Sequence, residues 1–274
     1  MTRTSYPLGI DVGGTGIKGA PVDLDKGAFA SERIRFETPA GASPDAVADV
    51  IAQIVEHFAD MIGDEPIGVT IPGVVQHGVV RTAANIDKAW IGTNAEELIS
   101  AHIGRDVLVV NDADAAGIAE NFYGAAKDTD GLVLVTTLGT GIGTAVINDG
   151  VLVPNSELGH IEVEGHDAET RAAHSAKERE ELSYGKWAKR LTKYYTSLEN
   201  LLWPDLFVVG GGVSKKAEKF LPLLDIRTPI VPAKLENAAG IVGAARLAKA
   251  EPDGYTLLWG SSGPLVISPV WGEG

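Results

Sequence analysis

The chain has 274 residues, a formal net charge of −14, no cysteine and 45% hydrophobic residues. The acidic balance argues against a nucleic-acid-binding surface, which needs clustered Lys and Arg to meet phosphates. The lack of cysteine excludes disulfides and thiolate metal sites, and it favours a reducing, cytoplasmic location. No apolar run approaches the roughly 20 residues of a membrane span, and the start MTRTSYPLGIDVGG enters an expected strand at once, which leaves no room for a secretory leader.

Strand and helix patterns mix along the whole chain, so the fold class is α/β. Residues 7–37 are expected to form three strands joined by turns, and residues 44–62 an amphipathic helix with Pro44 in its first turn. Residues 65–84 predict a strand and a hairpin. Further strands are expected at 106–110, 132–139, 144–149 and 206–212, and further helices at 94–103, 113–121, 166–200 and 236–249.

One short motif occurs twice in similar surroundings. Gly14-Thr15-Gly16-Ile17 recurs 125 residues later as Gly139-Thr140-Gly141-Ile142, each time after an apolar strand and before another strand. The repeat predicts two lobes that each present a glycine turn to a shared cleft. We expect an N-terminal lobe over 1–110, a C-terminal lobe over 111–250 whose last helix packs back on the first lobe, and an appended tail over 251–274.

The first glycine turn also matches the dinucleotide fingerprint, as Gly14-x-Gly16-x-x-Gly19. That fingerprint requires a helix to begin inside the motif, and Pro21 with the strand VDLD follows instead, which argues against a dinucleotide site. The alternative is a hairpin whose backbone amides point at an anion. Both turns are then phosphate loops, although either one alone is also compatible with an ordinary tight hairpin.

Several side chains beside these turns suit a phosphate donor. Asp11 precedes the first turn and suits Mg²⁺ carried with the donor, and Lys18 adds a positive charge. A third glycine run, Gly210-Gly211-Gly212, follows a buried strand and requires a close backbone approach. Lys215 and Lys216 beyond it either meet phosphates or are solvated.

Asn111 and Asp112 lie where a buried strand ends and a helix begins, which is where α/β proteins place reactive groups. Asp112 or Asp114 also suits a helix cap, but a single cap is enough for one helix. Farther along, Glu157 and His160 lie three residues apart around a glycine, and such side chains bind sugar hydroxyls, although a charged surface loop is the alternative. His160, His166 and His174 have spacings that fit no simple metal-binding pair.

With these residues together, the chain resembles the ROK sugar kinases, a family of repressors, open reading frames and kinases. The resemblance runs over nearly all of residues 7–249. It rests on GIDVGGTGIKG, IPGVV, VVNDADAAGIAE, TLGTGIG, ELGH and VVGGGVS, which occur in the family's order. Within the family, AANIDKAWIGTN and LFVVGGGVSKK are similar to the branch that uses inorganic polyphosphate.

The resemblance implies an actin-like (ribonuclease H-like) fold of two lobes that close over a cleft. It implies that Asp112 is the catalytic base. The implied sugar ligands are Gly73, Asn85, Asn111, Asp112, Glu157, His160 and Glu169. The implied donor ligands are Asp11, Gly13, Gly14, Thr15, Gly16, Lys18, Thr137, Gly139, Thr140, Gly141, Gly211, Gly212 and Lys215.

The chain departs from the family's pattern at the zinc site that many ROK proteins build from a histidine and a CxCGxxGC run. Here HIEVEGHDAETRAAHSAKERE follows ELG, so we expect no structural zinc. The repressor members carry a DNA-binding domain ahead of the phosphate loop. This chain begins directly at that loop, so we expect no DNA partner. The resemblance allows a homodimer.

The expected activity is phosphoryl transfer with Mg²⁺ from inorganic polyphosphate, ATP or both to the 6-hydroxyl of glucose, with mannose left open as an acceptor. A polyphosphate donor needs a cationic track, for which the candidates are Lys18, Arg81, Lys88, Lys215 and Lys216. The alternatives are an ATP-only kinase for another hexose or an N-acetylated amino sugar, an actin-like phosphatase, and a sugar sensor without catalysis.

Overall fold

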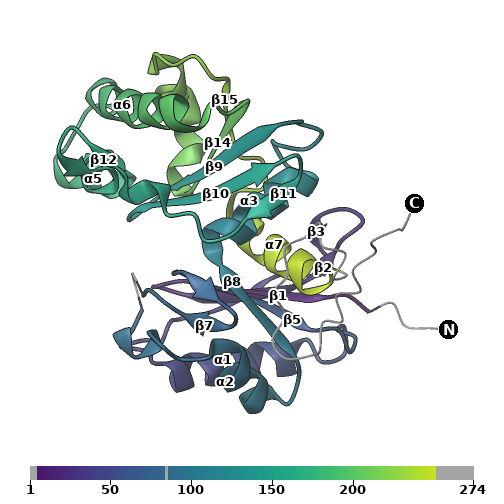
Figure 1. The fold of residues 1–274 in the computed structure, drawn as a ribbon. Helices are drawn as coiled ribbons and strands as arrows, with labels where there is room; N and C mark the ends of the chain where they lie inside the picture. The colour runs from purple at the N-terminus through teal and green to yellow at the C-terminus, as the bar shows by residue number, and fades with distance from the viewer. Residues whose placement is uncertain (1–4, 84–85, 251–274) are drawn as a thin grey trace, which may run out of the picture.

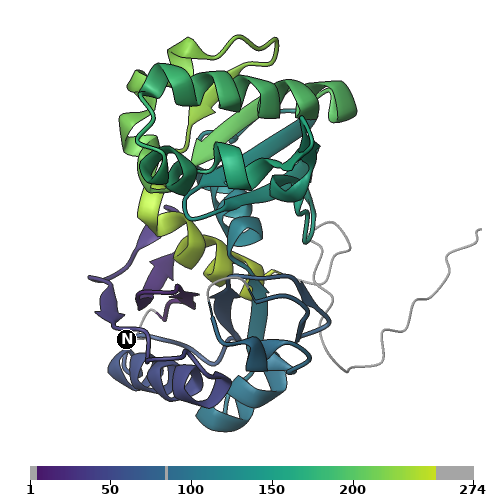
Figure 2. The same ribbon diagram turned by 90° about the vertical axis from the view of Figure 1, so that its left-hand side faces the viewer.

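The computed structural model describes residues 5–83 and 86–250. Two sheets lie one above the other, and the helices α3 (Asp112–Tyr123) and α7 (Ala239–Ala248) lie between them (Figure 1). The view turned by 90° shows the same two layers edge on, with α7 crossing the middle (Figure 2). Among the described residues, no helix is both long and apolar enough to cross a membrane.

The first sheet has the strand order β3-β2-β1-β5-β8, with β4 also paired to β2. β1 runs antiparallel to β2 and parallel to β5, and β5 is parallel to β8. The helices α1 and α2 cover the side that faces away from the second sheet (Figure 1). The bounds are β1 Leu8–Val12, β2 Ile17–Asp23, β3 Ala28–Phe29, β4 Ile34–Phe36, α1 Pro44–His57, β5 Ile67–Ile71, β6 Val75–Gln76, β7 Val79–Val80, η1 Lys88–Trp90, α2 Ala95–Ile103 and β8 Val107–Asn111.

The second sheet repeats this topology in the order β11-β10-β9-β14-β15. Again an antiparallel meander of three strands is followed by two parallel strands. The internal repeat in the sequence thus corresponds to a repeated strand–turn–strand unit. The bounds are β9 Leu132–Leu138, β10 Ile142–Asn148, β11 Val151–Val153, η2 Leu158–His160, β12 Glu162–Val163, β13 His166–Asp167, β14 Leu206–Gly210, η3 Gly212–Lys219, η4 Leu221–Leu223, β15 Ile230–Pro232 and η5 Glu236–Ala238.

The helical stretch expected over 166–200 is not continuous, because three helices occupy it: α4 (Ala168–Ala172), α5 (His174–Arg179) and α6 (Tyr184–Leu202). Each new start has a local cause. Ala173 is extended between the first two helices, and the Ser183 side chain accepts a hydrogen bond from the Lys186 N–H to cap the third. Polar periodicity alone does not reveal such breaks.

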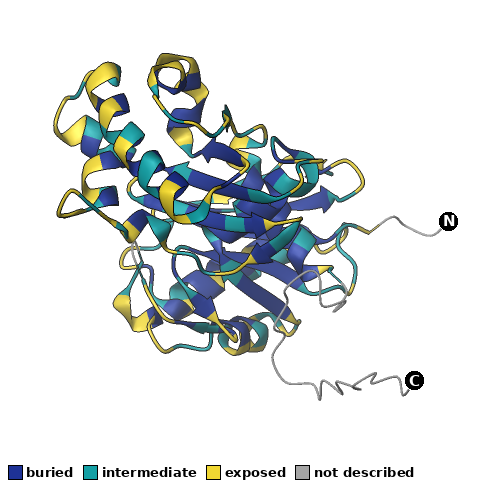
Figure 3. Ribbon diagram, turned by 45° about the horizontal axis from the view of Figure 1, so that its top comes forward, coloured by how far each residue is buried: buried dark blue, intermediate teal, exposed yellow. Residues whose placement is uncertain are grey.

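The core continues between the sheets through α3 and α7. Burial is concentrated in the strands, whereas the outer helices have exposed outer faces (Figure 3). Glycines allow α7 to approach closely: a Cβ on Gly68 of β5 would collide with the Ala244 carbonyl, and a Cβ on Gly243 would collide with the Ala115 carbonyl of α3. The last helix therefore packs against the first sheet and against the helix that follows β8.

Candidate active site

A cavity of about 650 Å³ lies between the two sheets. Strand ends and loops of both layers form its wall, as the topology predicts for a cleft between repeated units. The lining residues are Pro72, Gly73, Thr82, Ala83, Asn111, Asp112, Thr137, Gly139, Thr140, Gly141, Ile142, Gly143, Glu157, His160, Glu169 and Gly211. Eleven of the residues expected from the sequence to bind sugar or donor are thus brought together around one cavity.

The junction of β8 and α3 places Asp112 in this cavity. Asn111 is the helix cap, because its Oδ1 accepts hydrogen bonds from the N–H groups of Ala113 (2.8 Å) and Asp114 (3.0 Å). Its Nδ2 donates to the Gly73 carbonyl at 3.0 Å. With the cap supplied by Asn111, the two aspartates of the first turn are not needed for that purpose. The Asp112 carboxylate does accept one hydrogen bond, from Ala113 N–H at 2.9 Å.

The electrostatics of Asp112 suit a group that exchanges a proton near neutral pH. Some of its surface reaches the cavity, but the surrounding protein encloses it. This burial, together with the negative charges of Asp11 and, to a smaller extent, Glu157, raises the pKa of Asp112 from 3.8 to about 7. A carboxylate with such a pKa is matched to accepting a hydroxyl proton.

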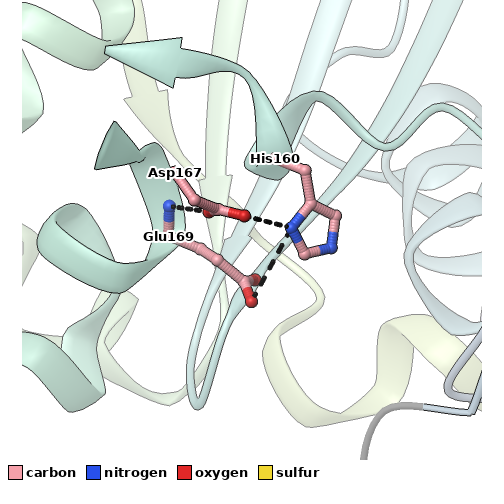
Figure 4. A group of neighbouring side chains, drawn as sticks. All are labelled: His160, Asp167 and Glu169. Atoms are coloured by element: carbon pink, nitrogen blue, oxygen red, sulfur yellow. Dashed lines mark hydrogen bonds and ion pairs between the residues drawn. The ribbon is translucent and has the colours of Figure 1, made fainter. Parts of the chain in front are cut away.

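Glu157, His160 and Glu169 form another part of the wall. The His160 Nδ1 atom lies 2.9 Å from Asp167 Oδ2 and 3.9 Å from Glu169 Oε1 (Figure 4). The hydrogen bond to Asp167, together with the nearby carboxylates, raises the pKa of His160. Burial raises the pKa of Glu157, which lies 3.7 Å from His160 Nε2. These side chains offer both acceptors and donors to a polyhydroxylated ligand.

Among residues 5–83 and 86–250, His160, Asp167 and Glu169 have ligand atoms within 4.8 Å of one another, as a metal site would. Hydrogen bonds explain their positions: Asp167 bonds the imidazole and also accepts from the Glu169 N–H at 3.1 Å. Glu169 Oε2 accepts from the Ile142 N–H at 3.0 Å. The group is therefore a hydrogen-bonded network that fixes the orientation of the imidazole.

The two repeated turns differ in where they lie. The second turn, Gly139 to Gly141, lines the cavity directly. The first turn, which contains Gly13, Gly14, Thr15 and Gly16, lies outside that cavity, but the strand ahead of it carries Asp11, whose charge acts on Asp112. Asp11 Oδ2 pairs with Lys18 Nζ at 3.2 Å, and its Oδ1 accepts from the Thr70 hydroxyl at 2.9 Å.

The third glycine run makes the close backbone approach that the sequence predicted. Gly211 has φ +83°, and a Cβ there would collide with the Leu138 backbone beside the second turn. Gly211 lines the cavity, whereas Gly212 begins η3 and lies outside the lining. Lys215 lies farther along η3 and pairs with Glu236 at 3.1 Å.

Asn85, expected as a sugar ligand, lies outside the described residues, as does the tail over 251–274. Sequence reasoning missed Thr82 and Ala83 in the cavity wall and Asp167 behind His160. Asp167 carried no sequence signal, because the β12–β13 hairpin that brings it back to His160 was expected to be part of a loop and a helix.

Comparisons with known proteins bear on this site. The model of the ROK family matches residues 7–171. The chain belongs to the ROK family. Over 251 residues it is 56% identical to the polyphosphate glucokinase of Mycobacterium tuberculosis (strain CDC 1551 / Oshkosh), covering 91% of this chain and 94% of that protein. The polyphosphate glucokinase of Mycobacterium leprae (strain TN) is 53% identical over 245 residues, which cover 89% of this chain and 75% of that protein.

Solved ROK structures agree with the fold. The crystal structure of inorganic polyphosphate/ATP-glucomannokinase from Arthrobacter sp. strain KM matches with a TM-score of 0.85 and 53% identity, covering 89% of this chain and 98% of that one. A ROK family glucokinase from Streptomyces griseus, in complex with glucose and AMPPNP, matches with a TM-score of 0.76 and 25% identity, over 89% and 99% of the chains. The fold is the actin-like, two-lobed fold of ROK sugar kinases.

Proposed function

We propose that this protein transfers a phosphoryl group from inorganic polyphosphate or ATP to the 6-hydroxyl of glucose. The observation that carries the proposal is Asp112, whose pKa is raised to about 7 at the floor of a cavity shared by the second glycine turn and by Glu157, His160 and Glu169. The high identity to polyphosphate glucokinases supports the choice of acceptor and donor.

In the proposed reaction, Asp112 accepts the proton of the 6-hydroxyl while the oxygen attacks the terminal phosphorus. The new O–P bond forms as the bond from that phosphorus to the bridging oxygen breaks, and ADP or a polyphosphate shorter by one unit leaves. The Gly139 N–H donates to the Gly141 carbonyl and closes the turn. The Gly141 amide and the hydroxyls of Thr137 and Thr140 hold the transferring group. Catalysis of this kind is mostly positioning and charge stabilisation.

The sugar-side residues have separate proposed tasks. Glu157, His160 and Glu169 bind hydroxyl groups, and Asn111 and the Gly73 backbone hold the other side of the ring. Because Asn111 Oδ1 is occupied by the helix cap, the part of its side chain that remains for the sugar is one N–H of the amide. Asn85 stays a proposed ligand.

Asp11 has the chemistry to hold Mg²⁺ that arrives with the donor. Its carboxylate supplies hard oxygen atoms, which this ion prefers, at a place where the charge of Asp11 acts on Asp112. The buried Thr70 hydroxyl donates to this carboxylate and holds it in place. The ion would neutralise charge on the phosphates. Lys18, paired to Asp11, adds a positive charge on the same side.

Ion pairs bear on two of the five cationic candidates for the donor track. Lys18 and Lys215 are each paired with a carboxylate. In contrast, Lys177 of α5 and Lys219 of η3 both lie over the ring of Tyr184, at 4.6 and 5.9 Å from its centroid. A cation–π contact holds a positive charge without cancelling it.

These two lysines lie on elements that begin at the cavity. Ser175 of α5 donates to the Thr140 carbonyl of the second turn at 2.5 Å, and η3 begins directly after Gly211. Burial and the charges of Lys177 and Lys216 lower the pKa of His174, although Glu178 opposes this effect. We propose that the trailing phosphates of a long polyphosphate pass between α5 and η3.

The function is tested by incubating the purified protein with glucose, Mg²⁺ and either ATP or polyphosphate as sole donor, and measuring glucose 6-phosphate. Product with polyphosphate is expected. Product with ATP alone would remove the polyphosphate donor, product from another sugar alone would change the acceptor, and glucose binding without product would indicate a sensor.

The donor track has its own test, with Lys177→Met and Lys219→Met compared against Lys215→Met as the matched control on η3. We expect the KM for long-chain polyphosphate to rise about threefold to tenfold in the first two variants, while the KM for tripolyphosphate changes less than about twofold. Equal changes for both chain lengths, or the same change in Lys215→Met, would contradict the track.

A further inference from the structure

Five residues behind the cavity are joined into a closed ring by hydrogen bonds and by the backbone of residues 73–75, and we call this the Asn155 ring. Asn155 Oδ1 accepts from Val75 N–H at 2.9 Å, and Asn155 Nδ2 donates to the Val75 carbonyl at 2.8 Å. The Asn155 N–H donates to Asp114 Oδ2 at 2.7 Å. The Asp114 N–H donates to Asn111 Oδ1, and Asn111 Nδ2 donates to the carbonyl of Gly73 in the same turn as Val75.

The ring connects three segments that come from both lobes. Gly73 and Val75 follow β5 of the first sheet, Asn155 follows β11 of the second sheet, and Asn111 and Asp114 lie at the start of α3. Each segment also carries a proposed contact of the acceptor sugar: the Gly73 backbone on the first, Glu157 two residues after Asn155 on the second, and Asp112 between Asn111 and Asp114 on the third.

An asparagine is specifically suited to position 155. Its φ is +59°, a left-handed conformation that asparagine tolerates better than most residues. Its amide both accepts and donates, so one short side chain pairs with the two backbone groups of Val75 as a neighbouring strand would. Aspartate lacks the donor and glycine lacks the side chain.

On the side away from the first cavity, the ring is held by its hydrogen bonds and not by close packing. A second cavity, of about 460 Å³, lies on the far side and is lined by Val75, Asn111, Asp114 and Asn155 among others. Asn111 lines both cavities and so forms part of the wall between them. Asp114 is only 3% exposed, and its Oδ1 atom has no hydrogen-bond partner among the described residues. The segments therefore have room to move if the ring opens.

We propose that Asn155 is a positioning residue that couples the two lobes and holds Gly73, Asn111 and Glu157 in one arrangement around the acceptor sugar. The effect on sugar binding rests on the proposed function, whereas the coupling of the lobes does not depend on it.

The main test variant is Asn155→Gly, which removes both bonds to Val75 and tolerates a positive φ. We expect KM and Kd for glucose to rise about tenfold, while kcat at saturating glucose and KM for the phosphate donor stay within about twofold to threefold. The matched control is Glu164→Gly, which removes a polar side chain at another positive-φ turn, where it pairs with Lys193. It should leave all these constants unchanged.

The coupling of the lobes is measured by distance. Because the chain has no cysteine, Gln53→Cys on α1 and Lys189→Cys on α6, both at exposed positions, give one specific pair of spin labels. With Asn155→Gly, the distribution of label distances in the absence of glucose should broaden, and saturating glucose should narrow it again. Glu164→Gly should keep the narrow distribution.

An unchanged glucose KM and an unchanged distance distribution in Asn155→Gly would overturn the proposal. An equal rise in KM for glucose and for the donor, without a change in the label distances, would also overturn it, because that pattern indicates general damage to the protein. If Asn155→Gly does not fold, Asn155→Asp keeps the acceptor for Val75 N–H but replaces the donor with a charged oxygen that faces the Val75 carbonyl, and the same selective rise in glucose KM is expected. If the wild type makes no glucose 6-phosphate, the proposed function fails, but the label distances still decide whether the ring couples the lobes.

Discussion

At the first glycine turn a guanidinium lies against the backbone, whereas at the second turn a carboxylate does. The Arg35 Nη2 atom donates to the Thr15 carbonyl at 2.6 Å, and a Cβ on Gly16 would lie 2.5 Å from that guanidinium. A Cβ on Gly141 would instead collide with the Glu169 carboxylate. One motif therefore serves two settings: carbonyls of the first turn accept hydrogen bonds from Arg35 and from the Thr38 hydroxyl, whereas the second turn contacts a proposed sugar ligand.

The strands behind the turns differ as well. In the first hairpin Val12 pairs with Ile17, which leaves four residues in the turn, and in the second Leu138 pairs with Ile142, which leaves three. The position of Asp11 in the first hairpin therefore corresponds to Thr137 in the second. In the proposed function, the acid of the first hairpin and the hydroxyl of the second are the side chains that meet the donor, so the two copies of the repeated unit carry different side-chain chemistry at this position.

The largest expected effect concerns the acids that this cleft brings together. Burial and the charge of Asp11 raise the pKa of Asp112 to about 7, and only the ionised form accepts a proton. We expect kcat/KM for glucose to fall about tenfold per pH unit below about pH 7, or about a hundredfold at pH 5. Asp11→Asn should move this acid limb to lower pH, as measured in a pH series.

Lys18→Met is the control for that series. It removes the cation paired to Asp11 but keeps the negative charge near Asp112, so its acid limb should not move to lower pH. A limb that stays at the same pH in Asp11→Asn would show that Asp11 does not act on Asp112.

The next effect comes from adding one methyl group to each turn. Gly141→Ala should raise the KM for glucose about tenfold, because the new Cβ displaces Glu169, and it should also raise the KM for the donor. Gly16→Ala should raise only the donor KM, by about threefold, because a flexible arginine end can shift away. Initial rates at varied glucose and varied donor separate the two constants. Equal effects of the two substitutions on the two constants would contradict the difference proposed between the turns.

A smaller effect is expected from Asp167, which contacts His160 on the sugar side of the second turn. Asp167→Asn keeps the size of the side chain but removes the charge at 2.9 Å from His160 Nδ1. We expect glucose Kd to rise about threefold to fivefold, as measured by calorimetry without donor, because the imidazole loses its fixed orientation. Donor KM should not change, and a donor effect as large as the glucose effect would contradict this role.

The smallest effect concerns the side chains that hold the turn carbonyls. Arg35→Ala and Ser175→Ala each remove one hydrogen bond to a turn, at Thr15 and Thr140 respectively. Each should raise the donor KM about twofold to fivefold and leave glucose Kd unchanged. A change in only one variant would mean that only one turn holds the donor.

The sequence predicts this fold well where the signal is local. The repeated Gly-Thr-Gly-Ile motif predicts both hairpins, and the apolar strand before Asn111 predicts the β8–α3 junction. The one-residue difference in register does not follow from the motif, because an offset of 125 residues pairs Asp11 with the buried Thr136 rather than with Thr137. Strand pairing, which depends on the whole sheet, sets that register.

The contacts between distant segments escape sequence reasoning for a similar reason. Asn155, Asp114 and Val75 meet only because two lobes and one helix converge, and Asp167 reaches His160 through a short hairpin. None of these pairs has a characteristic spacing in the chain. The sequence identifies groups that carry chemistry, whereas the residues that hold them in place become visible only in the structure.

The most direct test of the proposed chemistry is to compare Asp112→Asn with the wild type in both glucose binding and turnover. The account predicts that kcat falls by a factor of about 10² or more while glucose Kd, measured by calorimetry, stays within a few-fold. Near-wild-type turnover in Asp112→Asn would contradict the account, because the proton of the attacking hydroxyl would then be accepted by another group.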